Sequence, residues 1–184
     1  KSKGRLPKTL ISGSCVIAED YDKDGDLDLF VGGRLVPGKY PFPAKSMILE
    51  NNRGVFIDVT GKLAPELQEA GMVSAALWSD YDQDGLVDLI LTGEWMPIRI
   101  FRNGGEIFEE VTSKLQLDST NGWWNVIREC DINKDGLPDY VVGNLGENYK
   151  FTASKETPFP VYVNDFDGNG SQDIVLGYSN SGTY

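Results

Sequence analysis

The chain has 184 residues, 40% hydrophobic and 24% charged, which suits one soluble globular domain and excludes a disordered chain. Its formal net charge of −11 argues against a nucleic-acid partner, because phosphate binding requires a basic surface. The sequence contains no histidine, which removes the usual general base and the commonest zinc ligand.

The first expected elements surround an acidic loop. Aspartates stand at every second position from Asp20 to Asp28, between the apolar runs SCVIA (14–18) and LDLFVGG (27–33). The pattern returns at 80–88, 131–139 and 165–173, each time between two short apolar runs. We therefore expect a strand, an acidic loop and a second strand four times along the chain.

Two repeats continue with a second hairpin. The segments 47–60 and 98–112 each place an Asn-Gly type turn between two apolar runs. A turn of helix is expected near 64–71, between these two repeats. The third repeat is shortened, since 147–159 shows no clean pair of strands, and the fourth stops soon after its second strand.

Four short strands in a unit of this length are typical of a β-propeller blade. The predicted fold is therefore all-β, with blades of four antiparallel strands that form an incomplete part of a propeller. The expected blades cover about residues 11–60, 72–112 and 122–160, and a fourth opens at 161–184.

The spacing of the aspartates predicts calcium sites, because a loop that folds back on itself points alternate side chains inward. Calcium takes roughly six to eight oxygen ligands and tolerates irregular geometry. Glycine at the sixth loop position permits the sharp turn, and the seventh residue offers its backbone carbonyl. We expect about two to four Ca²⁺ ions. The predicted ligands, loop by loop, are Asp20, Asp22, Asp24, Asp26 and Asp28; Asp80, Asp82, Asp84, Leu86 and Asp88; Asp131, Asn133, Asp135, Leu137 and Asp139; and Asp165, Asp167, Asn169, Ser171 and Asp173.

The acidic loops are compatible with other structures. Polar Asp-Gly turns that bind no ion remain an alternative, and most of all for the third and fourth loops, where one Asn replaces an aspartate. An EF-hand requires flanking helices and an acidic twelfth position, whereas that position here is Val31, Leu91, Val142 or Leu176. This residue also argues against a dockerin, and the nonapeptide repeat of RTX proteins is absent.

The acidic loops with FVGG (30–33), NNRGVFIDVT (51–60) and RNGGEIFEEVT (102–112) resemble the FG-GAP or VCBS repeats of integrin α-subunits and cartilage acidic protein. The segment VNDFDGNGSQDIVLGY (163–178) is similar to bacterial members of the cartilage-acidic-protein type. The resemblance implies a seven-bladed propeller with calcium between the first two strands of each blade. A ring of seven blades of about 50 residues would exceed this chain, so we expect a fragment of a longer protein, with open strand edges that favour self-association.

The main functional hypothesis is a non-enzymatic, calcium-stabilised module outside the cytoplasm that binds a protein or a glycan, as in cell adhesion. Candidate contacts are the aromatic residues near loops: Tyr40, Trp95, Trp123, Trp124 and Tyr149. Packing between blades is the alternative for these residues. A polysaccharide-degrading enzyme is a second hypothesis, although Glu94, Glu106, Glu109, Glu110 and Glu147 form no recognisable motif. A pure scaffold in a larger secreted protein is the third.

The remaining features concern location. No apolar run approaches 18 residues, so no transmembrane segment is expected. The loops favour an extracellular, cell-surface or periplasmic setting, where calcium is abundant. Cys15 and Cys130 are far apart in the sequence, and a disulfide stays open, although two buried thiols are the favoured interpretation.

Overall fold

The computed structural model describes residues 4–9, 11–146, 153–154 and 156–178. The chain divides into two compact units, Lys1–Asn144 and Leu145–Tyr184. The described part is nearly all β-strand, and its paired strands are antiparallel. This confirms the all-β prediction.

The first unit begins with a four-stranded sheet in the order β1-β2-β3-β4. Its strands follow one another in sequence, as in a propeller blade. The apolar runs on either side of the first acidic loop form β1 and β2, and the predicted hairpin at 47–60 forms β3 and β4. The bounds are β1 (Ser12–Glu19), β2 (Asp28–Leu35), β3 (Met47–Asn52) and β4 (Val55–Asp58).

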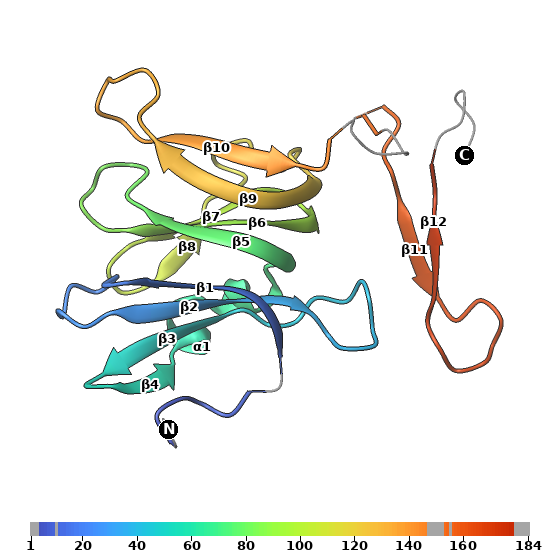
Figure 1. Cartoon of the computed structure of the whole chain (residues 1–184), viewed down its shortest axis with the longest axis horizontal. Helices are drawn as coiled ribbons and strands as arrows, with labels where there is room; N and C mark the ends of the chain where they lie inside the picture. Colours follow the sequence, from blue (N-terminus) through green and yellow to red (C-terminus); the bar gives the residue numbers. More distant parts are fainter. Residues whose placement is uncertain (1–3, 10, 147–152, 155, 179–184) are drawn as a thin grey trace. The chain divides into compact units, whose positions relative to one another are not determined.

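A second set of four antiparallel strands repeats this arrangement through the pairs β5–β6, β6–β7 and β7–β8. A third hairpin, β9–β10, follows, and β9 also pairs with the end of β6. The bounds are β5 (Met72–Ser79), β6 (Asp88–Met96), β7 (Arg99–Asn103), β8 (Phe108–Glu110), β9 (Gly122–Cys130) and β10 (Asp139–Asn144). Figure 1 shows the three groups of strands side by side.

The second unit contains one described hairpin, β11 (Val161–Asn164) with β12 (Asp173–Leu176). It flanks the fourth acidic loop as predicted. Most of the irregular segment predicted for the third repeat, including Tyr149 and Glu147, lies outside the described residues.

The link between the first two sheets is helical. It consists of α1 (Thr60–Leu63) and the 3₁₀ helix η1 (Pro65–Glu69), in which Pro65 occupies the first turn. The turn of helix expected near 64–71 is therefore confirmed. Within the described residues, neither helix has the length or the apolar character needed to cross a membrane.

The core of the first unit lies on both faces of the second sheet. On one face Tyr21 stacks on Trp78 at 6.1 Å between ring centroids, and Phe108 meets Tyr21 edge-on at 5.6 Å. On the other face Ile90 and Ile127 belong to a second buried cluster. Burial on both faces explains why β6 contains the unbroken apolar run Leu89–Leu91 rather than an alternating pattern.

The cysteines are free, which excludes the disulfide that the sequence left open. Cys15 is half-buried, but Cys130 is exposed. The expectation of two buried thiols is therefore wrong for Cys130. It ends β9, whose only fully buried side chain is Ile127 on the face toward the second sheet.

Candidate metal centre

All four acidic loops share one backbone turn. The carboxylate of the first aspartate accepts a hydrogen bond from the amide of the sixth-position glycine, at 2.8–3.1 Å in the four loops. The fifth side chain accepts from the seventh amide at 2.7–2.9 Å. The repeated motif in the sequence therefore corresponds to a repeated local structure.

The turn requires two residues with positive φ, in the left-handed region, and the glycine pattern of the sequence predicts one of them. The sixth-position glycines have φ between 84° and 95°, as expected for a residue without a Cβ. The fourth position is also left-handed, at Lys23, Gln83, Lys134 and Gly168. Only Gly168 signals this in the sequence, because lysine and glutamine do not favour positive φ.

The ninth-position aspartate begins the second strand of each hairpin, and in the first three loops it is the most buried carboxylate of its loop. Asp28 and Asp88 are both 0% exposed. The backbone amides of Asn51 and Asn103, on the third strands, donate to their Oδ1 atoms at 2.7 and 2.8 Å. The third strand thereby holds the carboxylate at the base of the loop, a role that the sequence did not reveal.

Three of the four loops bring carboxylates together. In the first, second and fourth loops the first, third and ninth aspartates have oxygens within 4.8 Å of one another: Asp20, Asp22 and Asp28; Asp80, Asp82 and Asp88; Asp165, Asp167 and Asp173. The third loop has Asn133 at the third position and two carboxylates at the corresponding points. These clusters hold nine of the predicted ligands.

The other predicted ligands lie outside these clusters. The fifth-position carboxylates, Asp24 and Asp84, accept the seventh-position amides and lie beside the clusters rather than in them. The side chain of Asp26 is likewise not a cluster member. The role of the seventh-position carbonyls, at Asp26, Leu86, Leu137 and Ser171, stays a prediction.

The buried oxygens fit a cation better than any donor of the chain. Asp28 Oδ2 is buried and has no hydrogen-bond partner. Asp20 Oδ1 and Asp80 Oδ1 are also buried without a hydrogen-bond partner. The Tyr21 amide lies near Asp28 Oδ2 without reaching hydrogen-bond geometry, whereas the Tyr81 amide donates to Asp88 Oδ2 at 3.1 Å. A buried acceptor without a donor is costly, and a hard cation with oxygen preference removes this cost.

The electrostatics of the metal-free loops agree with this reading. Burial raises the pKa of Asp28 to about 6, with Asp22 and Asp24 adding repulsion and the Asn51 amide opposing the shift. Burial likewise raises the pKa of Asp88 to about 6, against the donors from Asn103 and Tyr81. Without a cation, these sites resist full ionisation.

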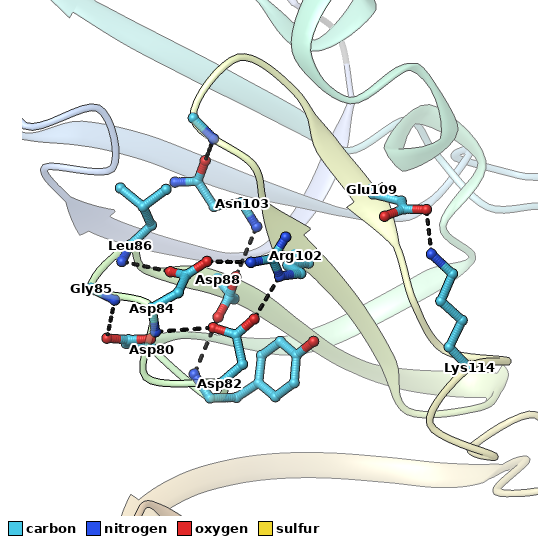
Figure 2. A network of polar contacts seen from close by, with 12 residues as sticks. Asp80, Asp82, Asp84, Gly85, Leu86, Asp88, Arg102, Asn103, Glu109 and Lys114 are labelled. Atoms are coloured by element: carbon cyan, nitrogen blue, oxygen red, sulfur yellow. Dashed lines mark hydrogen bonds and ion pairs between the residues drawn. The ribbon is translucent and has the colours of Figure 1, made fainter.

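The second loop already contains a cation from the chain. Arg102, on β7, donates from Nε to Asp82 Oδ2 at 2.5 Å, and its Nη2 contacts Asp84. Figure 2 shows the guanidinium reaching the two carboxylates from the neighbouring strand. The sequence does not reveal the role of Arg102, because only the pairing of β6 with β7 brings it to the loop.

The four described ligand-contact candidates are half-buried, and Trp95 contacts both Tyr40 and Trp123. Trp95 Nε1 donates to the Tyr40 hydroxyl at 2.7 Å, and the Trp95 and Trp123 rings lie 5.3 Å apart. Trp124 Nε1 donates to the Thr120 carbonyl. Trp95 also has a φ of 60°, an outlier for so bulky a residue. These side chains are therefore held in place rather than displayed freely.

Three of the five glutamates weighed for catalysis, Glu94, Glu109 and Glu110, are engaged in ion pairs. Glu94, 2% exposed, pairs with Arg34, and Glu110 pairs with Arg99 through Nε at 2.7 Å. Glu109 pairs with Lys114 at 2.5 Å. Glu110 lines a surface pocket with Glu66, Glu69 and Arg99, and Glu94, Glu106 and Glu109 do not line that pocket.

The strands and loops together define a class of protein: antiparallel blades with an acidic loop between the first and second strands. Residues 80–142 match the family model of the FG-GAP-like repeat. The match spans both the second and the third acidic loops, and it confirms that the chain carries an FG-GAP-like repeat. No curated protein matches the chain.

Proposed function

We propose that the chain is a calcium-stabilised propeller module in which each bound ion ties the first two strands of a repeat to the third. The environment of Asp28 is the observation that carries this proposal. Its carboxylate is fully buried, one oxygen lacks a donor, and two further aspartates converge on it. The FG-GAP-like repeat supports the module, and the acidic clusters support the cation.

The ligands proposed in the first loop are Asp20, Asp22 and Asp28, with the carbonyl of Asp26 and water completing the set. The second and fourth loops offer the corresponding residues. Bound calcium would supply positive charge and oxygen coordination, and four ions would change the formal charge of the chain from −11 to about −3. The third loop, with one carboxylate fewer, is the weakest candidate.

Thermal melting with calcium and with chelator, together with a metal count per chain, tests the calcium proposal. We expect about two to four ions per chain. Each site stabilises the fold by about 2.7 kcal/mol when calcium exceeds its dissociation constant a hundredfold. An unchanged melting temperature with no bound metal would leave the Asp-Gly turns as the explanation of the motif.

We further propose that the module binds a protein or glycan outside the cytoplasm and does no chemistry. The FG-GAP-like repeat and the calcium loops support the setting, and the ion-paired glutamates speak against hydrolysis of polysaccharides. A scaffold role in a larger secreted protein remains the competing proposal.

A glycan and protein array in calcium buffer, run beside a turnover assay on the same polysaccharides, separates these roles. Retained ligand without turnover supports a binding module, and turnover supports an enzyme. A scaffold gives neither signal.

A further inference from the structure

The first two acidic loops are equivalent in backbone but face different residues from the third strand. The register pairs Leu29 with Leu49 in the first sheet and Leu89 with Phe101 in the second. Leu49 and Phe101 are therefore equivalent, and so are the residues that follow them on the third strands, Glu50 and Arg102. The next residues, Asn51 and Asn103, make matching hydrogen bonds to the ninth-position aspartates, which confirms the equivalence.

Arg102 occupies Asp82, one of the three carboxylates on which a cation at the second loop would depend. Its Nε holds Asp82 Oδ2, and the Asp84 amide donates to Asp82 Oδ1 at 3.3 Å, so both oxygens of this cluster member are engaged. Figure 2 shows the arginine side chain in contact with both Asp82 and Asp84. The two aspartates also raise the pKa of the guanidinium, with its hydrogen bond to Asp82 as the largest cause.

The first loop has the opposite environment. Within the part of the chain that the structure describes, no ion pair involves an aspartate of this loop. Glu50 instead adds negative charge, and it contributes to the raised pKa of Tyr21, the residue after Asp20. The Tyr21 amide favours the charged form of Asp28 as the Tyr81 amide does that of Asp88, so the two loops differ in the residue that the third strand supplies. The negative charge of the first loop is therefore less compensated by positive side chains than that of the second loop.

We infer that the two loops differ in calcium affinity, so that the first loop fills before the second. Arg102 competes with calcium for the carboxylates of the second loop, whereas Glu50, at the equivalent position, adds negative charge beside the first. This inference rests on the proposed calcium function. Calcium binding at the second loop must displace the guanidinium from Asp82, whereas binding at the first loop displaces no side-chain cation. The strand position next to the asparagine is thus a position that sets affinity.

The amides of Gly25 and Gly85 allow each loop to be followed separately. Each donates to the first aspartate of its own loop, at 3.1 and 2.9 Å. A calcium titration of the ¹⁵N-labelled chain, followed by the two glycine amide signals at about 0.1 M salt, gives one midpoint per loop. We expect Gly25 to reach its midpoint at about tenfold lower calcium, the order of effect of one unit charge near a divalent ion in water.

Substitutions at the equivalent positions test the cause. We expect Arg102→Gln to lower the Gly85 midpoint about tenfold and to leave Gly25 unchanged, and Arg102→Glu to lower it further. Glu50→Arg should raise the Gly25 midpoint and spare Gly85. Arg102→Lys keeps the charge and should stay close to the parent. Lys62→Gln, on α1, is the control for loss of one positive charge and should alter neither midpoint.

The outcomes separate this inference from the proposal on which it rests. If neither glycine responds to calcium and melting is unchanged, both fail. If both glycines saturate but Arg102→Gln leaves the Gly85 midpoint in place, or Gly85 fills first in the parent chain, only the ordered filling is overturned. Circular dichroism of each variant checks that it is folded, and the Arg102→Lys chain supplies a reading if the glutamate variant is not.

Discussion

Asp28 and Asp88 show how burial disfavours the charged form of two equivalent carboxyl groups. Both begin a second strand, both are buried, and both have a pKa raised to about 6 by burial. A carboxyl group whose pKa is raised by folding favours the protonated folded state, so its cost to stability grows as pH rises from about 4 through about 6. In the metal-free chain this cost is present in full at neutral pH.

Asp28→Asn should therefore stabilise the metal-free chain at pH 7.5 and abolish the gain from calcium at the first loop. The asparagine side-chain oxygen still accepts the hydrogen bond from the Asn51 amide. The substitution removes a buried negative charge that has no positively charged partner. We expect a gain of about 1–2 kcal/mol in chelator, from urea denaturation, less than the full pKa difference implies. The matched control is Asp26→Asn, in which the carbonyl is kept, so the calcium gain should persist. A loss of stability of Asp28→Asn in chelator would contradict this account.

Gly93 shows a constraint at the scale of the strand. It lies in β6 where the pairing with β5 shifts register between Val73 and Ala75. A Cβ at Gly93 would lie 2.2 Å from the Met72 carbonyl oxygen and 2.5 Å from Met96 Sδ. Because the first of these atoms is backbone, the strands themselves would have to separate.

Gly93→Ala should destabilise the calcium-loaded chain by about 1–3 kcal/mol, the cost of overpacking a close contact. The measurement is urea denaturation in excess calcium. Gly61→Ala in α1 is the control, since its Cβ would meet only Gln68 Nε2 at 3.5 Å. The helical glycine should be neutral or gain up to about 1 kcal/mol. Equal effects at the two positions would show that the close approach at Gly93 is not limiting.

The sequence revealed the strands because each acidic loop separates two apolar runs, and the sixth-position glycines located the turn. It did not reveal Arg102 or Glu50, because their effect depends on which residue of the third strand faces the loop. That register is set by the pairing of Leu29 with Leu49 and of Leu89 with Phe101. The contact of Trp95 with Tyr40 was equally hidden, since the two are brought together by tertiary packing.

At the scale of the whole molecule, charge is the dominant feature. The chain carries 28 acidic and 17 basic residues, and the acidic loops of the first unit lie at one end of their strands (Figure 1). The third loop is tied to the second by Gln83 Nε2, which donates to the Gly136 carbonyl at 3.4 Å. Repulsion within and between such loops is long-ranged and falls as salt shortens the Debye length.

Salt should therefore stabilise the metal-free chain more than the calcium-loaded one. Between 0.1 and 1 M NaCl the Debye length falls from about 10 Å to about 3 Å, which weakens repulsion among carboxylates that no ion offsets. We expect the melting temperature in chelator to rise across this range, and the rise in calcium to be smaller, because the bound ions already offset the loop charges. Arg102→Gln should enlarge the rise in chelator, since it removes a cation from the second loop. Equal rises with and without calcium would contradict this account. The destabilising repulsion would then come from negative charges spread over the surface and not from the acidic loops.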